Sequence, residues 1–293
     1  MSRNERKDRA TPPPLPEPLR VAVADSHTHL DMQSGDPADA LAAAASVGVE
    51  TVVQVGCDVA GSRWAADLAA AHPAVWATVA LHPNEAPRLV LGDPDGWSGQ
   101  RRPPGGRAAL DAALDEIAAL AALPQVRGVG ETGLDYFRTG PEGVAIQHES
   151  FRRHIDIAKR HDKTLVIHDR EAHDDVLRVL AEEGAPDRVV FHCYSGDAAM
   201  AKVCADHGWW MSFAGNVTFG SAQPLRDALL AAPRELLLVE TDAPFLTPVP
   251  HRGRPNAPYL IPVTLRAMAA VRGDDEDELA AAVAANTARA FTY

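Results

Sequence analysis

The sequence predicts an α/β fold of the (β/α)8 class, also called the TIM barrel, and two observations support this. From residue 21 onward, short β-branched or apolar runs alternate with amphipathic, alanine-rich stretches, which is typical of β/α units. Eight runs of each kind fit into about 250 residues, as a closed eight-stranded parallel barrel requires. An open doubly wound sheet would instead place a glycine-rich phosphate loop after its first strand, where this chain has Asp25-Ser26-His27-Thr28-His29.

The expected strands are short and end in polar or turn-forming residues. They lie at 21–24, 51–55, 75–81, 126–130, 164–167, 188–191, 209–213 and 236–239. The helices expected to follow them lie at 37–47, 62–71, 107–122, 142–161, 171–183, 197–207, 222–231 and 259–271, and a last helix at 276–291 closes the bottom or side of the barrel.

Two segments fall outside this pattern of strands and helices. Residues 1–20 are charged and rich in proline, so we expect a disordered, flexible N-terminal tail ahead of a barrel domain at residues 21–293. Residues 92–106 form a long loop after the third strand. A loop of this length is either a lid near the active face or a neutral insertion.

The composition indicates a folded, acidic protein. Hydrophobic residues make up 46% of the 293 residues and charged residues 23%, which provides enough apolar surface for a large core. The 28 basic and 40 acidic residues give a net charge of −12, which disfavours a protein that coats duplex nucleic acid. The three cysteines are widely spaced, and the chain has neither a long apolar run nor a secretory signal. We therefore expect a cytoplasmic protein that needs no membrane and no obligate protein partner.

Side chains of the metal-ligand type follow five of the expected strands. They are His27 and His29 after the first strand, Glu131 after the fourth, His168 after the fifth, His192 after the sixth and Asp242 after the eighth. The carboxyl ends of all barrel strands meet at one face, so a single fold would gather these six residues. Because residues at i and i+2 of a strand point the same way, His27 and His29 can bind one ion together.

Six ligands are more than one ion needs, which predicts two divalent ions that share a carboxylate. We assign His27, His29 and Asp242 to one ion, His168 and His192 to the other, and Glu131 to the bridge between them. Four imidazoles favour Zn, Mn, Co or Ni over Mg, because Mg prefers oxygen ligands and water. Zn, Mn and Mg remain the candidate ions, since availability in the cell also decides which is bound.

Several blocks of the sequence resemble the TatD family of metal-dependent deoxyribonucleases. They are residues 25–31, 130–136, 192–196, 240–246 and 250–256, with Asn286 and Phe291 near the end of the chain. The resemblance implies an amidohydrolase-like barrel and a two-metal phosphodiesterase that commonly acts as a 3′-to-5′ exonuclease on DNA. The family's metal positions fall on the same six residues. Asn84 departs from the pattern, because many members have histidine there.

Two-metal chemistry suggests roles for the remaining polar residues. The ions lower the pKa of a water that attacks the phosphorus, with Asp242 as the general base and Glu131 holding the ions. Arg138 and Arg252 are candidates to bind a phosphate of the substrate, and their charge suits the end of a single DNA strand. His82 and Asn84, after the third strand, are candidates to contact the substrate or to support the metal ligands.

An alternative activity uses the same barrel. Many metal-dependent amidohydrolases cleave amides, or esters such as an aminoacyl group, with a similar arrangement of histidines and aspartate. Those with two ions often bridge them with a modified lysine, whereas here Glu131 ends the fourth strand and no lysine lies near it in the sequence. A binding module without activity is the third possibility, and the intact set of six ligands argues against it.

Overall fold

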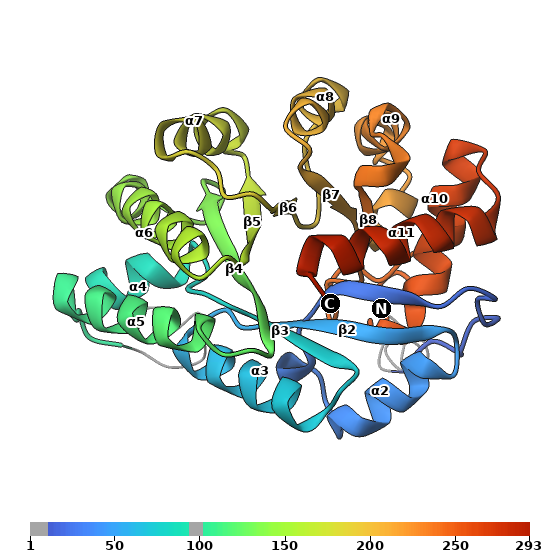
Figure 1. Ribbon diagram of the computed structural model, residues 1–293, viewed down its shortest axis with the longest axis horizontal. Coiled ribbons are helices and arrows are strands. Elements are labelled where there is room, and N and C mark those ends of the chain that lie inside the picture. Colours follow the sequence, from blue (N-terminus) through green and yellow to red (C-terminus); the bar gives the residue numbers. More distant parts are fainter. Residues whose placement is uncertain (1–10, 94–101) are drawn as a thin grey trace, which may run out of the picture. The chain divides into compact units, whose positions relative to one another are not determined.

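The computed structural model describes residues 11–93 and 102–293, and eight β-strands alternate with helices along this chain (Figure 1). Every strand is followed by at least one helix. This is the element order of the (β/α)8 barrel, so the predicted fold class is confirmed. The described residues group into two compact units. The first contains the chain up to Gln54 and from His192 onward, and the second contains Val55–Phe191.

The first unit contains four parallel strands in the order β7, β8, β1, β2. They are β1 (Val23–Thr28), β2 (Val49–Val55), β7 (Trp210–Phe213) and β8 (Leu237–Val239). Past the end of β8, Ala243 forms a parallel bridge with Thr28, and the N–H of Asp242 donates to the carbonyl of His27 at 2.9 Å. These bonds join the carboxyl ends of β1 and β8.

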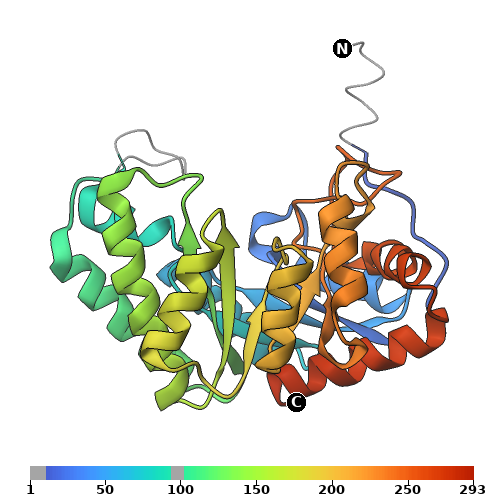
Figure 2. The same ribbon diagram turned by 90° about the horizontal axis from the view of Figure 1, so that it is seen from above.

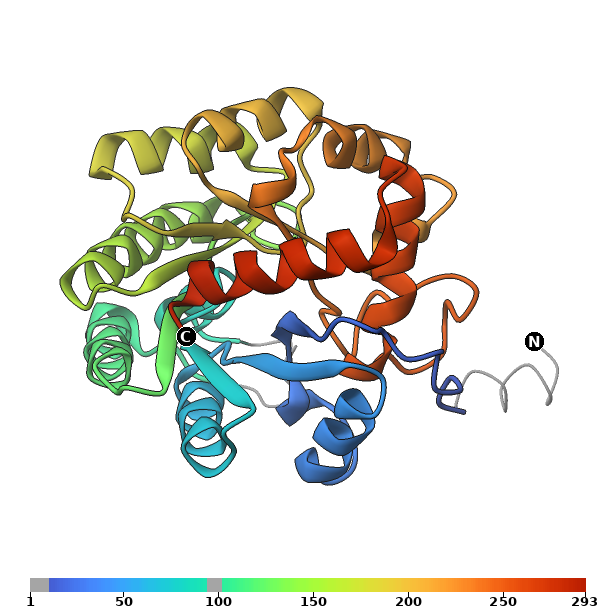
Figure 3. The ribbon, with the colours of Figure 1, turned by 45° about the vertical axis from the view of Figure 1, so that its right-hand side comes forward.

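Five α-helices belong to the described part of this unit. They are α2 (Pro37–Ala45), α8 (Ala198–Asp206), α9 (Gln223–Ala231), α10 (Ile261–Arg272) and α11 (Glu276–Phe291). Helices α8 and α9 lie side by side (Figure 2), and α11 packs against β1 and β8 (Figure 3). Short 3-10 turns η1 (Leu30–Met32), η2 (Gly215–Thr218), η3 (Arg234–Leu236) and η4 (Pro258–Leu260) complete it.

The second unit contains the parallel strands β3, β4, β5 and β6 in chain order. They are β3 (Val75–Val79), β4 (Val126–Asp135), β5 (Thr164–Arg170) and β6 (Val189–Phe191). The helices are α3 (Val59–Ala71), α4 (Glu85–Leu91), α5 (Gly106–Ala121), α6 (Pro141–Arg160) and α7 (His173–Glu183). Helix α6 packs on β4 and contacts both α5 and α7 (Figure 1).

Local sequence signals explain where several helices begin. Asp36, Asp58, Asp197 and Asp275 each accept a backbone N–H from the first turn of the helix that follows, at the starts of α2, α3, α8 and α11. Such caps satisfy N–H groups that have no partner inside the helix. Across residues 11–93 and 102–293, no helix combines the length and hydropathy needed to cross a lipid bilayer.

Strands β1, β2, β4 and β5 are longer than the sequence predicted, and the largest extensions are those of β4 and β5. Strand β4 continues past Gly130 to Asp135, and β5 continues through His168 to Arg170. The two extensions pair with each other, with Gly133 opposite His168. The sequence did not predict these extensions, because the run of apolar residues that indicates a strand stops before the polar residues within them. The predicted ligands Glu131 and His168 therefore lie within strands rather than after them.

Helix α4 was not predicted, because its seven residues are too few to show a helical period. It packs against α5 and α6, and these tertiary contacts stabilise it. Of the predicted loop at 92–106, the described part includes an antiparallel bridge between Asp93 and Arg102, and α5 begins at Gly106. The remaining residues, 94–101, lie outside the described part, so the choice between a lid and a neutral insertion stays open.

Residues 11–20 have no regular secondary structure, yet they are bound along the first unit. Arg254 donates to the carbonyls of Thr11 and Pro12 at 2.8 and 2.7 Å, and the hydroxyl of Tyr259 donates to that of Pro13 at 2.8 Å. Leu19 is buried, with its N–H bonded to the carbonyl of Val47 at 3.0 Å. Residues 1–10 of the expected flexible tail lie outside the described part of the chain, so the flexibility of the tail stays a prediction. The described residues 11–20 form what we call the strap, because side chains of this unit bond to its carbonyls. The domain boundary at residue 21 stays a prediction.

We expect Gly133→Ala to lower the free energy of unfolding by roughly 1–3 kcal/mol. Gly133 has φ +136°, which residues with a side chain rarely adopt, and a Cβ there would collide with the carbonyl oxygen of His168. Urea unfolding checks this, with Gly220→Ala as the control, since a Cβ at Gly220 meets no atom within 4 Å. Equal losses in both variants would contradict the argument.

We expect Tyr259→Phe to lower the free energy of unfolding by about 1 kcal/mol, because the carbonyl of Pro13 loses its hydrogen bond. The strap should also become a faster target for limited proteolysis, with cleavage sites identified by mass spectrometry. Unchanged cleavage within residues 11–20 would show that this bond does not hold the strap. Tyr293→Phe, at the other end of the chain, is the matched control.

Candidate metal centre

Two histidines at the end of β1 converge on a carboxylate that follows β8. His27 and His29 are buried, and their Nε2 atoms lie 3.2 Å apart. Asp242 Oδ1 lies 3.4 Å from His29 Nε2 and 3.9 Å from His27 Nε2. Ligands of one tetrahedral zinc ion, with bonds of about 2.1 Å, stand about 3.4 Å apart. The structure thus brings these three predicted ligands to spacings that fit a single divalent ion.

Asp25 fixes the backbone on both sides of this cluster. Its Oδ1 accepts the N–H groups of His27 at 3.2 Å and Thr241 at 2.9 Å, and its Oδ2 accepts the Thr241 hydroxyl. Burial raises the pKa of Asp25 to about 8, although the bonds from Thr241 and His27 act in the opposite direction. Asp25 therefore connects the chain segments that carry His27 and Asp242.

His192 has a buried carboxylate behind its ring. Its Nδ1 lies 3.3 Å from Glu240 Oε1, which also accepts the N–H of Cys193 at 2.8 Å. Burial raises the pKa of Glu240. The ring of His192 stacks on that of His27, with centroids 3.8 Å apart. A histidine that donates Nδ1–H to a carboxylate keeps Nε2 as a metal ligand, which is a common arrangement in metal sites.

The second unit holds a cluster around Glu131. Glu131 Oε2 lies 3.2 Å from His168 Nδ1, and the thiol of Cys57 donates to Oε1 at 3.3 Å. The other nitrogen of His168, Nε2, lies 3.3 Å from Asp135 Oδ2. Burial by itself would raise the pKa of Asp135, but hydrogen bonds and charge from His168, with bonds from Asn84 and the backbone, hold it well below its usual range. A His168 ring that donates Nε2–H to Asp135 keeps Nδ1 as a metal ligand beside Glu131.

His82 and Asn84 support this cluster. His82 Nε2 lies 3.9 Å from Glu131 Oε2, and its ring contacts that of His168 edge-on. Because His82 Nδ1 accepts the N–H of Asn84 at 3.0 Å, the ring proton is on Nε2, which suits a hydrogen-bond donor rather than a metal ligand. The amide of Asn84 donates to Asp135 Oδ2 at 2.8 Å and is buried, so it supports Asp135 and through it His168.

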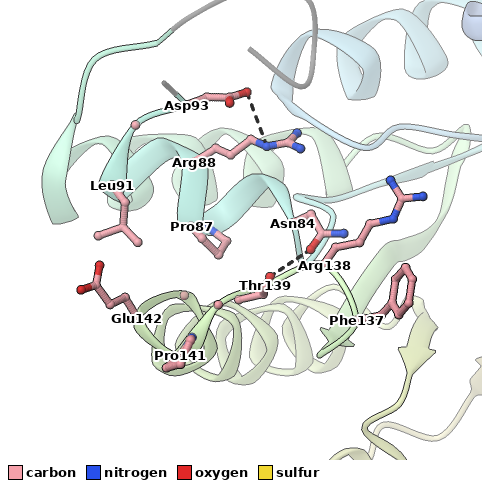
Figure 4. Close-up of a pocket in the computed structure, with 13 residues that line it drawn as sticks. Asn84, Pro87, Arg88, Leu91, Asp93, Phe137, Arg138, Thr139, Pro141 and Glu142 are labelled. Carbon is pink, nitrogen blue, oxygen red and sulfur yellow. Dashed lines mark hydrogen bonds and ion pairs between the residues drawn. The ribbon is translucent and has the colours of Figure 1, made fainter. Parts of the chain in front are cut away.

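The two arginines predicted to bind phosphate, Arg138 and Arg252, are exposed, and each makes one contact that restrains it. The N–H of Arg138 donates to Asp135 Oδ1 at 3.0 Å, and the side chain lines a pocket beside Asn84 (Figure 4). Arg252, in the first unit, places its guanidinium 4.2 Å above the ring of Phe219. Both groups are accessible cations, as a phosphate contact requires.

Reasoning from the sequence did not assign roles to the supporting carboxylates. Asp25, Asp135 and Glu240 are buried and bond to ligands or to the backbone beside them. Each lies two to four residues from a predicted ligand, at 27, 131 and 242. The sequence feature that could have identified them is an acidic residue at the end of an apolar strand. A charge buried there needs a hydrogen-bonded or charged partner.

The fold and these clusters define a class of protein. Histidines and carboxylates near the carboxyl ends of strands in a (β/α)8 fold, each histidine with a hydrogen-bonded partner, are typical of a metal-dependent hydrolase. Carboxylate and imidazole ligands of this kind suit Zn or Mn and accept Mg.

Known proteins of one family resemble this chain along almost its whole length. A family model described as TatD related DNase matches residues 24–292. A Mycobacterium tuberculosis protein named an uncharacterized metal-dependent hydrolase, TatD, is 44% identical over 277 residues, which cover 92% of this chain and 97% of the relative. A Salmonella typhimurium protein named 3′-5′ ssDNA/RNA exonuclease TatD is 32% identical, covering 87% and 93%. The crystal structure of YJJV, a TatD homologue from Escherichia coli, has a TM-score of 0.79 at 26% identity, covering 92% and 98%.

The chain belongs to the TatD family, as its sequence blocks indicated, and it is a metal-dependent hydrolase of the TatD type. The Mycobacterium relative is metal-dependent by name, which agrees with the ligand clusters described above.

We expect Glu240→Gln to weaken metal binding about 10-fold or more, because a neutral amide makes the imidazole of His192 a poorer ligand. Calorimetric titration of Zn or Mn into metal-stripped protein measures this. The control is Glu278→Gln on α11, which removes an exposed negative charge that pairs with Arg234. This variant should bind metal like the wild type. Equal metal affinity in both variants would refute a role for Glu240.

Proposed function

We propose that this hydrolase is a 3′-to-5′ exonuclease that removes nucleotides from the ends of single-stranded DNA. The observation that carries the proposal is the pair of ligand clusters, His27–His29–Asp242 in one unit and His168–Glu131 in the other. The printed name of the Salmonella relative, a 3′-5′ ssDNA/RNA exonuclease, supports the choice of nucleic acid as substrate. The cytoplasmic location expected from the sequence belongs to the same proposal.

Two divalent ions, Zn, Mn or Mg, are part of this proposal. His27, His29 and Asp242 would hold one ion, His168 and His192 would hold the other, and Glu131 would serve both. When bound, such ions lower the pKa of a water molecule toward about 7 and neutralise charge on the phosphate oxygens. The buried partners Asp25 and Glu240 keep the ligands oriented.

The protein side chains then position the substrate and move protons. Asp242, whose side chain is 13% exposed, accepts a proton from the attacking water as the general base. His82 donates its Nε2–H to a phosphate oxygen, since its Nδ1 is occupied. Arg138 and Arg252 bind phosphates of the strand, and Asn84 supports the site through Asp135. These cations offset locally the negative charge of an acidic protein.

Digestion of a 5′-labelled single-stranded DNA oligonucleotide tests the proposal. Metal-stripped protein is supplied with Mg, Mn or Zn, and Asp242→Asn is assayed beside the wild type. We expect a metal-dependent ladder that shortens from the 3′ end, and a rate at least about 100-fold lower in the variant, which loses a ligand and a base. Asp227→Asn, on the exposed side of α9, is the control and should cleave normally.

Other substrates decide what a negative result means. A matching RNA oligonucleotide shows whether the sugar matters. If protein that holds two equivalents of metal cleaves neither strand but hydrolyses an aminoacyl ester or an amide, the exonuclease assignment is wrong and the alternative activity predicted from the sequence replaces it.

A further inference from the structure

A pocket of about 990 Å³ lies in the second unit, which also holds the Glu131–His168 cluster. One wall is α4 with the residues next to it, from Asn84 to Asp93, and the other runs from Phe137, after β4, to Gly143 in the first turn of α6 (Figure 4). Its volume is in the range of pockets that hold small organic ligands. Asn84 connects it to the cluster, because the Asn84 amide bonds to Asp135, which bonds to His168.

An exposed aromatic ring lines this pocket. Phe137 is 57% exposed, a large fraction for a phenylalanine, and Leu91 on the opposite wall is 43% exposed. The guanidinium carbon of Arg170 lies 3.9 Å from the centroid of the Phe137 ring, so one face of the ring is covered by a cation. More than half of the residue is nevertheless exposed, so part of the ring is open to a ligand. A ring held in this way is oriented before any ligand arrives.

The charges around the ring differ at the two ends of the pocket. Arg138 follows Phe137 directly, and its backbone is fixed by the bond to Asp135. The guanidinium of Arg88 is already paired with Glu85 and Asp93. Glu142 adds a negative charge at the far end. A single phosphate is therefore attracted beside Phe137, and a second phosphate farther along α4 is not.

We propose that this pocket binds one unpaired nucleotide of the substrate, with its base stacked on Phe137 and its phosphate at Arg138. The inference rests on the proposed exonuclease function and gives that function a base-binding subsite. An aromatic face stacks with any base, so the subsite selects no sequence. A base in a duplex has both faces covered by its neighbours, and so it cannot use the ring without unstacking. Phe137 thus favours single strands.

Binding of abasic oligonucleotides to the metal-loaded protein tests this subsite. Labelled single-stranded DNA carries phosphorothioate linkages at its 3′ end to resist cleavage and an abasic residue at one of the last three positions. Fluorescence anisotropy gives Kd for each. In the wild type we expect one position at which loss of the base raises Kd about 5-fold or more. In Phe137→Ala that penalty should disappear, and in Phe137→Trp it should remain.

Controls separate this inference from the proposed function. Leu230→Ala, a truncation of an exposed apolar side chain on α9, should keep the wild-type penalty. The same penalty in Phe137→Ala as in the wild type, or no penalty at any position, overturns the subsite even if the protein digests DNA. A penalty that depends on Phe137 supports the subsite even if unmodified DNA is not cleaved, in which case the exonuclease function alone is rejected.

Discussion

Much of the first unit's chemistry depends on the hydrogen bonds of one buried carboxyl group, Asp25. By accepting hydrogen bonds from the N–H groups of both His27 and Thr241, it sets the relative positions of the carboxyl ends of β1 and β8. The distance between the histidines and Asp242 is therefore fixed by protein bonds. A site prepared in this way spends little free energy on rearrangement when an ion binds, which favours tight binding and a defined geometry.

Buried carboxylates also orient other predicted ligands. Glu240 lies behind His192, and Asp135 lies behind His168. Burying Glu240 costs free energy, which appears as the raised pKa of this carboxyl group. A bound divalent cation offsets that cost. The buried acidic groups therefore contribute to metal affinity. We expect loss of a supporting carboxylate to weaken metal binding nearly as much as loss of a ligand.

The fold class and the family could be predicted from the sequence because strand and helix periods repeat along the chain and the ligand blocks are distinctive. Other features could not be predicted. The extension of β4 to Asp135 depends on pairing with β5, a long-range contact that no local pattern encodes. The role of Asn84 depends on a bond to Asp135, 51 residues away. The same holds for Tyr136, which bonds to His148 and Asp175, and for Tyr194, which is buried against Phe213.

The strap at residues 11–20 has a practical consequence for anyone who shortens this chain. The family match begins at residue 24, so a chain trimmed to that boundary would lack the strap. Arg254 and Arg266 would then lose the carbonyl groups that they now bind, and the site occupied by Leu19 would be uncovered. A trimmed protein would therefore expose apolar surface that Leu19 now covers, and exposed apolar surface promotes self-association during purification.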